Sequence, residues 1–418
     1  MAHLHKRFND AQVRELLARY LKDEIPGSYI QEVLRIKRSR FFMLLKKYQD
    51  DPGAFSIQYE RKKQAPRIPQ QAEDAILKEL AIEKTLIQNK DVPVRSYNYS
   101  YIKDRLRSEY DQSVSLPTII NRAKEHGFYL KRPKRSAHDR EVLTHYAGQL
   151  IQHDSSFHLW APAADEKWHL ITSLDDYSRF ILYAELVRRE SSWAHILALQ
   201  TVFLKYGFPF SYYVDSHSIF RFVQGRDSTW RNHQKLTDDI DPQWKQVLQD
   251  CGVKVIYALS PQAKGKIERP YQWLQDRLVR TCVRDNTTDI RRARTFLNHE
   301  IQRYNYRQVH STTLEVPALR LQKALRDKKT LFRQFQIKPP LKSVRDVFCL
   351  RLDRTVDAYR RVSINNLPLK VNKADPDDRL CVRFYPMTGG VTELRFWRDD
   401  LLLDVQQLKT SDLAGVQF

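Results

Sequence analysis

Apolar residues recur every three or four positions at the start of the chain, a spacing typical of amphipathic helices. Residues 10–23 carry such a stripe, with Asn9 or Asp10 as the helix cap. The turn Ile25-Pro26-Gly27-Ser28 ends this helix, and residues 28–34 and 39–48 form two further short helices. The pattern therefore predicts a helix-turn-helix unit over residues 1–53.

The same outline recurs after a linker at residues 54–70 that contains Pro and Lys. Residues 71–84, 99–110 and 115–126 have helical periodicity, and a Ser followed by Pro is a typical start for the last of these helices. We predict a second helix-turn-helix unit over residues 71–130. A helical bundle without DNA contact is the alternative, because three-helix outlines are common.

The pattern over residues 148–285 alternates between strands and helices. Three apolar strand-like runs are followed by a helix, a strand, a helix, a strand and a long helix. Their ranges are 150–154, 168–174, 180–185, 191–206, 211–214, 242–250, 253–258 and 264–283. This order predicts an α/β core with a mixed sheet and helices on its faces.

The last third of the chain divides into two parts. Residues 286–340 form a basic helical segment. Residues 344–410 hold short apolar runs typical of strands, which are clearest at 347–352, 361–364, 380–385 and 391–397. Asn365-Asn366 and Gly389-Gly390 are the expected turns. We predict a small C-terminal β-barrel, so that the whole chain is a multidomain protein.

Composition adds a basic charge that is unevenly distributed. The chain has 71 Lys and Arg against 50 Asp and Glu, a net charge of +21. Residues 1–140 hold 29 basic against 18 acidic residues, residues 141–260 hold 11 against 14, and residues 261–360 hold 23 against 10. This excess favours a polyanionic partner, because phosphates bound by Lys and Arg release counterions. A basic protein without a nucleic-acid partner is the alternative.

Other features narrow the class of protein. The chain has no run of 18 apolar residues and begins without an apolar signal core, so neither a membrane partner nor secretion is expected. Its four cysteines are scattered and form no CxxC pair, which argues against a disulfide scaffold or a structural zinc site. We expect a reduced compartment, the bacterial cytoplasm, with nucleoid association when DNA is bound.

Three carboxylates occupy positions suited to metal binding. Asp154 lies on the first strand of the predicted sheet, Asp215 ends the fourth, and Glu268 opens the long helix, which begins near Lys266. Carboxylates on strand ends and a flanking helix can converge on Mg²⁺, which prefers oxygen ligands. Two such ions about 3.5–4 Å apart promote phosphoryl transfer, and Mn²⁺ is the expected substitute.

Four motifs in this region carry a resemblance to a known family. They are Gln152-His153-Asp154-Ser155-Ser156, Leu174-Asp175-Asp176-Tyr177-Ser178-Arg179, Tyr213-Val214-Asp215-Ser216 and Ser260-Pro261-Gln262-Ala263-Lys264-Gly265-Lys266-Ile267-Glu268-Arg269. In this order they resemble the retroviral-integrase-type catalytic core of bacterial insertion-sequence DDE transposases. Each motif alone is a weak signal, but four in order are a strong one.

The resemblance covers residues 148–285 and implies a ribonuclease H-like fold. It also implies Mg²⁺-dependent DNA strand cleavage and strand transfer, with Asp154, Asp215 and Glu268 as the catalytic and metal-binding residues. The chain departs from the family where Ser216-His217 replaces the Asn-Gly that often follows the second Asp. Residues 217–240 also lengthen the interval to Glu268 relative to retroviral integrases.

Basic residues beside these units are the candidate DNA contacts, with solvated surface positions as the alternative. The candidates are Arg38, Arg40, Lys46, Lys47, Arg122, Lys124, Lys131, Arg132, Lys134, Arg135, Lys264, Lys266 and Arg269. A second group on the basic helical segment is expected to run along DNA between subunits. It consists of Arg291, Arg292, Arg294, Arg303 and Arg307.

Other conspicuous residues receive structural interpretations. Asp175 and Asp176 are expected to form a turn rather than to bind metal. His153 is expected to pack on the face opposite Asp154, because strand neighbours alternate, and His217 is a weaker candidate for a catalytic role. The tryptophans at 160, 168, 193 and 273 are expected in the core.

These patterns together predict a transposase that binds double-stranded DNA at the terminal inverted repeats of an element and joins it to target DNA. A dimer or larger homo-oligomer on DNA is expected, because two ends must be joined and one chain offers one carboxylate set. The alternatives are a structure-specific nuclease on the same fold and a non-catalytic DNA-binding regulator derived from a transposase. The paired helix-turn-helix outlines argue against the first alternative, and the three carboxylates argue against the second.

Overall fold

The computed structural model describes residues 4, 8–58, 68–130, 143–215, 242–258 and 265–413, with the backbone alone at residues 265–269. Residues 1–70 and 71–418 are two compact units. Within the described ranges, no helix has both the length and the apolar character needed to cross a membrane.

The first unit consists of three helices around a small apolar core. They are α1 (Asp10–Leu21), α2 (Gly27–Leu34) and α3 (Arg38–Asp50). The Asn9 side chain accepts a hydrogen bond from the Gln12 backbone N–H and so caps α1, while Val13 and Phe41 are buried in the core. The predicted helices are therefore confirmed, and their use as a DNA-binding motif stays a prediction.

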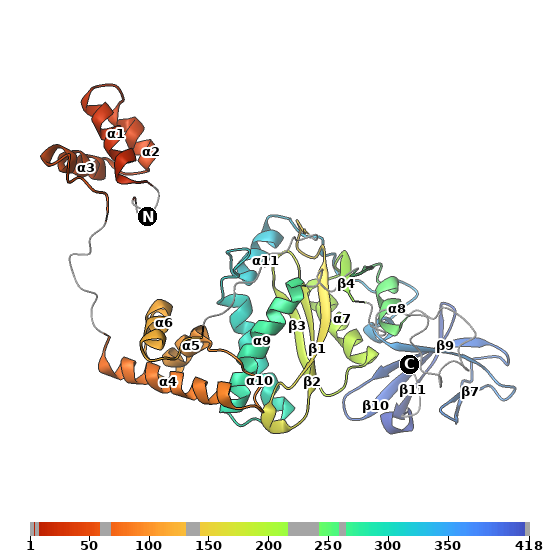
Figure 1. The fold of residues 1–418 in the computed structure, drawn as a ribbon. Coiled ribbons are helices and arrows are strands. Elements are labelled where there is room, and N and C mark those ends of the chain that lie inside the picture. The colour runs from red at the N-terminus through yellow and green to blue at the C-terminus, as the bar shows by residue number, and fades with distance from the viewer. Residues whose placement is uncertain are drawn as a thin grey trace. The chain divides into compact units, whose positions relative to one another are not determined.

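The second unit begins with three more helices, α4 (Gln70–Gln88), α5 (Tyr99–Tyr110) and α6 (Leu116–Glu125). Ser115 caps α6 by accepting a hydrogen bond from the Thr118 backbone N–H, and Pro117 lies in the first turn, as the sequence predicts. These helices lie beside α9 and α10 of the same unit, and they do not form a free-standing bundle (Figure 1).

A five-stranded mixed sheet follows, which confirms the predicted α/β core. Its elements are β1 (Ile151–His158), β2 (Trp168–Asp175), β3 (Ile181–Val187), α7 (Ser192–Tyr206), β4 (Ser211–Val214), α8 (Gln243–Asp250), β5 (Lys254–Tyr257) and α9 (Gly265–Arg284). The strand order is β3-β2-β1-β4-β5. The pairs β3–β2 and β2–β1 are antiparallel, whereas β1–β4 and β4–β5 are parallel. This arrangement fits the ribonuclease H-like core that the resemblance implies.

The remaining elements are helices α10 (Ile290–Tyr306), α11 (Pro317–Arg326) and α12 (Val344–Val347), followed by six strands. The strands are β6 (Leu350–Thr355), β7 (Arg361–Ile364), β8 (Leu367–Lys370), β9 (Arg379–Pro386), β10 (Val391–Arg398) and β11 (Leu401–Lys409). They form a four-stranded antiparallel sheet, β11-β10-β9-β6, and a separate β7–β8 hairpin. Closure into a single barrel is not confirmed and stays a prediction.

The two predicted turns of this β-rich part are present. Asn365 and Asn366 have φ angles of 51° and 62° and connect β7 to β8, with Ile364 opposite Leu367. Gly389 and Gly390 have φ angles of 87° and 74° between β9 and β10. One apolar core runs from α7 and α8 into these strands through Phe203, Trp244 and Phe348.

Candidate active site

The pairing of β1 with β4 brings the first two predicted carboxylates together. Gln152 of β1 lies opposite Tyr213 of β4 in parallel register. Two residues beyond this pair lie Asp154, within β1, and Asp215, which directly follows the last residue of β4. Neighbouring strands lie about 4.8 Å apart, so the two partly buried carboxylates share one face at one end of this strand pair.

Helix α9 covers this face of the sheet. The Thr172 hydroxyl, directly opposite Asp154 in β2, donates a 2.8 Å hydrogen bond to the hydroxyl of Tyr271 in α9. One turn later, Gln275 Nε2 donates to Ser156 Oγ at 3.2 Å. The helix therefore crosses β1 and β2 next to Asp154.

The backbone of residue 268 lies in the first turn of α9, three positions before Tyr271. One helical turn separates these two positions. The helix begins at Gly265, one residue from the predicted start, and Pro270 lies inside it. The side chains of Lys266, Glu268 and Arg269 are outside the described side chains, so the third carboxylate stays a prediction from the sequence.

Electrostatics independently connect Tyr271 to both aspartates. Burial raises the pKa of the Tyr271 hydroxyl well above the ordinary value for tyrosine, and the nearby charges of Asp154 and Asp215 raise it further. Tyr271 is thus a neutral hydrogen-bonding group at any ordinary pH. Sequence reasoning missed it, although its spacing of three residues from Glu268 is a signal that helical periodicity offers.

The two consecutive aspartates at the end of β2, Asp175 and Asp176, have structural partners, as expected. Both side chains are buried. Asp175 accepts hydrogen bonds from the backbone N–H groups of Gly148 and Ser178, at 2.8 and 2.9 Å. Asp176 accepts from Gln152 Nε2 and from the Arg179 guanidinium, at 2.7 and 2.9 Å. Burial raises the pKa of Asp175 to about 6.

His153 packs on the opposite face, which confirms the alternation argument. Its ring is fully buried and stacks on Trp244 at a centroid distance of 5.7 Å. Its Nδ1 is 2.8 Å from Ser173 Oγ, and its Nε2 is 2.8 Å from Nδ1 of His195 in α7. His217 lies outside the described residues.

The predicted core tryptophans are buried wholly or in part. The side chains of Trp160 and Trp168 are fully buried. Trp193 and Trp273 are partly buried and pack against the apolar clusters of the core.

The candidate DNA contacts divide by their surroundings. On α3, Arg38, Arg40 and Lys46 are exposed, and the exposed Lys47 donates to the Ser56 carbonyl at 2.6 Å. In α6, Lys124 is exposed, whereas the Arg122 guanidinium forms ion pairs with two carboxylates. Five further candidates lie outside the described residues, namely Lys131, Arg132, Lys134, Arg135 and Lys264.

The basic helical segment differs from the expected DNA-facing stripe. Arg292 pairs with Asp285, Arg294 with Glu185, and Arg303 with Asp104 of α5. Arg291 and Arg307 are exposed. Three of these five arginines are therefore paired with carboxylates within the protein, and two of the partners, Glu185 and Asp104, come from distant parts of the chain.

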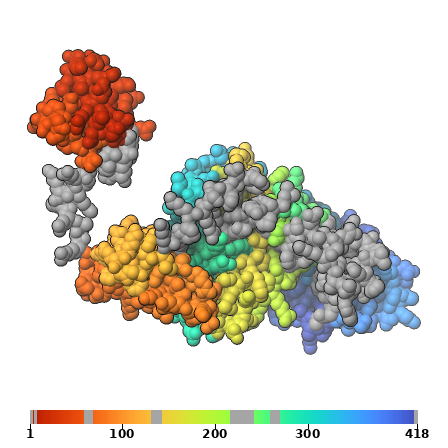
Figure 2. Space-filling model, viewed as in Figure 1, coloured from red at the N-terminus to blue at the C-terminus, as the bar shows by residue number. Residues whose placement is uncertain are grey.

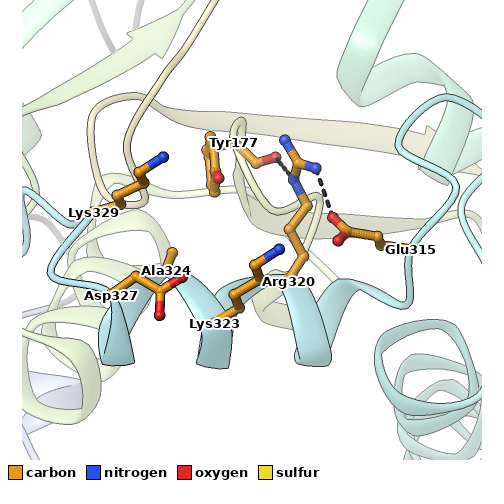
Figure 3. Close-up of a pocket in the computed structure, with 7 residues that line it drawn as sticks. All are labelled: Tyr177, Glu315, Arg320, Lys323, Ala324, Asp327 and Lys329. Atoms are coloured by element: carbon orange, nitrogen blue, oxygen red, sulfur yellow. Dashed lines mark hydrogen bonds and ion pairs between the residues drawn. The ribbon is translucent and has the colours of Figure 1, made fainter.

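A cavity of about 120 Å³ lies between the β2–β3 turn and α11 (Figure 3). Arg320 Nε donates to the Tyr177 carbonyl at 2.9 Å, and another guanidinium nitrogen donates to Glu315 at 2.7 Å. This turn adjoins the start of β1, because Asp175 pairs with Ile151. Neither Asp154 nor Asp215 lines this cavity, so it is separate from the candidate active site.

A complete metal centre is not formed by the described side chains alone, among which no cluster of three His, Cys, Asp or Glu residues occurs. Asp154 and Asp215 offer two carboxylates, and the side chain of Glu268, the expected third, is outside the described side chains. Hard oxygen donors of this kind fit Mg²⁺ or Mn²⁺ better than Zn²⁺.

Comparison with known proteins gives two relatives by sequence. The chain is 29% identical over 247 residues to "Putative transposase y4bF" of Sinorhizobium fredii, covering 59% of this chain and 49% of that protein. It is 28% identical over 243 residues to "Transposase for insertion sequence IS1202" of Streptococcus pneumoniae, covering 57% and 49%. The chain thus spans about half the length of these relatives. No protein-family model matches it.

Solved structures show a weaker likeness. The HTLV-2 integrase catalytic core domain in complex with magnesium, in a trimeric form, is 14% identical with a TM-score of 0.31, covering 42% of this chain and 96% of that one. A simian T-cell lymphotropic virus intasome chain is 13% identical with a TM-score of 0.34, covering 71% and 96%. These scores are too low to support an argument about the present chain. The two sequence relatives confirm the resemblance to insertion-sequence transposases.

Proposed function

We propose, from the premise that the chain resembles insertion-sequence transposases, that it is a DNA transposase. In this proposal the protein binds the terminal inverted repeats of an element, cleaves a DNA strand there and joins the new end to target DNA. A cytoplasmic location in a bacterial cell, on the nucleoid when DNA is bound, belongs to the same proposal.

The observation that carries this proposal is the register of β1 and β4. It supports a shared location for Asp154 and Asp215 at one end of this strand pair, although 61 positions separate them in the sequence. Helix α9 crosses the same face and carries residue 268 one turn before Tyr271. The charges of both aspartates raise the pKa of the Tyr271 hydroxyl. Two carboxylates on neighbouring strands and a third on the covering helix suit a pair of divalent cations.

The proposed site holds Mg²⁺, or Mn²⁺ in its place, on Asp154, Asp215 and Glu268. Bound ions would supply Lewis-acid activation and would neutralise the charge that develops on the phosphate. In the first reaction a water oxygen attacks phosphorus and the bond to the 3′ oxygen breaks, leaving a 3′-OH. That 3′-OH then attacks a target phosphodiester, whose own 3′ oxygen leaves.

The DNA-binding part of the proposal rests on the first unit. Its helix α3 exposes Arg38, Arg40 and Lys46 on one short element, beside the apolar core that holds the three helices together. Exposed cations on a helix of this length can contact phosphates on both sides of a groove. We propose α3 as the recognition helix, with α6 as the corresponding element of the second set of helices.

The test is metal-dependent cleavage and joining of candidate element-end DNA. Asp154→Asn, Asp215→Asn and Glu268→Gln are each expected to abolish both reactions while end-DNA binding persists. Asp399→Asn, in an exposed turn between β10 and β11, is the matched control and should retain full activity. More than about 1% residual activity in a variant would remove that residue from the site, because a lost metal ligand costs several kcal/mol of transition-state stabilisation.

The same assay separates the alternative functions. Cleavage without joining to target DNA would identify a nuclease. End binding without any metal-dependent cleavage by the unaltered protein would identify a regulator.

A further inference from the structure

Helix α9 contacts two different parts of the second unit, the five-stranded sheet and the helices α4 and α5. Its first half packs on the sheet beside Asp154 through Tyr271 and Gln275. Its second half carries Arg277, Arg280 and Arg284, whose side chains are 1%, 0% and 11% exposed. Three arginines on one helix are rarely buried to this extent unless each is paired.

Arg277 also pairs with Glu300 of α10, and Arg280 with Asp276 of α9 itself. Their other partners come from helices about 170–200 positions earlier in the chain. Arg280 donates to Glu83 of α4 at 2.6 Å. Arg284 is 2.8 Å from Glu79 and 3.3 Å from Glu83, and both glutamates are completely buried. Arg277 donates to Asp104 of α5 at 2.7 Å.

Apolar and neutral polar contacts complete this interface. Val92 and Val94, from the loop after α4, pack in one cluster with Val279 of α9. The hydroxyls of Tyr101 in α5 and Thr281 in α9 are 3.1 Å apart. Residues 70–130, orange in Figure 2, accordingly lie directly against the core of the unit.

We propose that Glu79, Glu83, Arg280 and Arg284 are positioning residues for the active site. By holding the second half of α9, they fix the helix that carries residue 268 over the face of the sheet on which Asp154 and Asp215 lie. This inference rests on the proposed function, in which Glu268 is the third metal ligand. It assigns α4 to α6 to the catalytic machinery, so any DNA they bind is held at a fixed distance from the carboxylates.

The ionic character of the interface supports a positioning role. A desolvated charge is tolerated only when its partner sits in one well-defined geometry, because the attraction must offset the cost of dehydration. An apolar contact of the same area would permit sliding along α9, whereas the Glu79–Arg284 and Glu83–Arg280 pairs select a single docking position. Displacement of a catalytic group by about 1 Å can lower a rate about 100-fold.

The test uses the full chain, three variants of the interface and one control variant. Arg280→Met leaves Glu83 without its closest partner, and Glu83→Gln is a milder change that keeps the side-chain shape. A double variant, Glu83→Met with Arg280→Met, replaces the pair by apolar side chains of similar length, a change that buried pairs often tolerate. Arg379→Met removes an exposed ion pair with Asp353, far along the chain from α9, and is the matched control.

Two measurements are made on each variant. The first is hydrogen exchange of the α9 backbone amides from Tyr271 to Gln275, in protein free of metal and DNA. The single variants should exchange there at least about tenfold faster than wild type, and the double variant and the control should match wild type. The second measurement compares the affinity for end DNA with the cleavage rate. The single variants should lose about 100-fold in cleavage rate and less than about threefold in affinity.

Unchanged exchange in both single variants would overturn the proposal, as would a double variant that docks normally but stays inactive. A parallel loss of affinity and rate would also overturn it, since that result indicates a folding role alone. The exchange measurement needs neither metal nor DNA. An inactive wild-type protein would therefore refute the proposed function, while the exchange result would still decide whether the interface fixes α9.

Discussion

Replacing Asp176 by asparagine should destabilise the protein without removing a metal ligand. The Asp176 carboxylate is 1% exposed and is held by Gln152, Arg179 and the Thr144 hydroxyl, at 2.7, 2.9 and 2.7 Å. Asparagine keeps the size and one acceptor oxygen, but it leaves the Arg179 guanidinium, only 10% exposed, without a counter-charge. The change therefore tests whether a carboxylate within a family motif acts in structure or in catalysis.

The expected loss of stability follows from the burial of the Asp176–Arg179 ion pair. Removing one partner of a buried ion pair costs about 3–5 kcal/mol, and the retained acceptor oxygen favours the lower end, about 3 kcal/mol. That loss is a large share of a typical stability of about 5–15 kcal/mol. It corresponds to a fall in melting temperature of about 4 °C, because the second unit spans residues 71–418 and the shift per kcal/mol shrinks as a folded unit grows.

The assay combines thermal unfolding with cleavage measured well below the melting temperature. We expect Asp176→Asn to melt lower but to keep most of its cleavage activity per folded molecule. Asp154→Asn should melt at nearly the wild-type temperature but lose its cleavage activity, because Asp154 is only partly buried and lies on the face of the candidate site. An Asp176→Asn variant as stable as wild type but inactive would refute this reasoning and would place Asp176 in the metal site.

Four further results are expected. Tyr271→Phe should lower the unfolding free energy in denaturant titrations by about 1–3 kcal/mol, because the buried Thr172 hydroxyl loses its acceptor, and an unchanged value would contradict the contact. Burial raises the pKa of Asp175 from 3.8 to about 6, so the folded state holds this proton more tightly than the unfolded state. Raising the pH from about 4 to above 6 should therefore cost up to about 3 kcal/mol of stability, a dependence that Asp175→Asn should lose and that pH-resolved unfolding would measure. Residues 1–70 alone should bind element-end DNA with an affinity that falls steeply with salt, and equal affinity for a scrambled duplex would leave only phosphate binding. The active species should be a dimer or larger on paired ends, and concerted joining of two ends by single chains in a sizing experiment would disprove this.

Local patterns predicted most elements because their cause is local. The helices α1 to α6, the order of the mixed sheet elements and the hairpin turn at Asn365-Asn366 follow from periodicity, caps and residues that tolerate positive φ. Strands β8 and β11 were not among the clearest predicted runs. Their assignment depends on pairing with β7 and β10, which a single segment does not encode.

The chemistry of the candidate site was visible in the motifs, but its geometry was not. Asp154 and Asp215 stood out by strand position and family resemblance, whereas their adjacency depends on the β1–β4 register. Tyr271 carries no charge and belongs to none of the four motifs. Its helical spacing from Glu268 is a weak signal in the sequence, and its burial near both aspartates is visible only in the structure.

The sequence by itself determined which residue types are present, where the chain forms helices and strands, and that its charge is strongly basic. The tertiary structure alone decided how that charge is used. The basic stretch of residues 261–360 includes Arg277, Arg280 and Arg284. Folding nevertheless buries these arginines against acidic residues of α4 and α5. The physical reason is that a formal charge is local, whereas its counter-charge and its exposure to water depend on which distant segments pack against it.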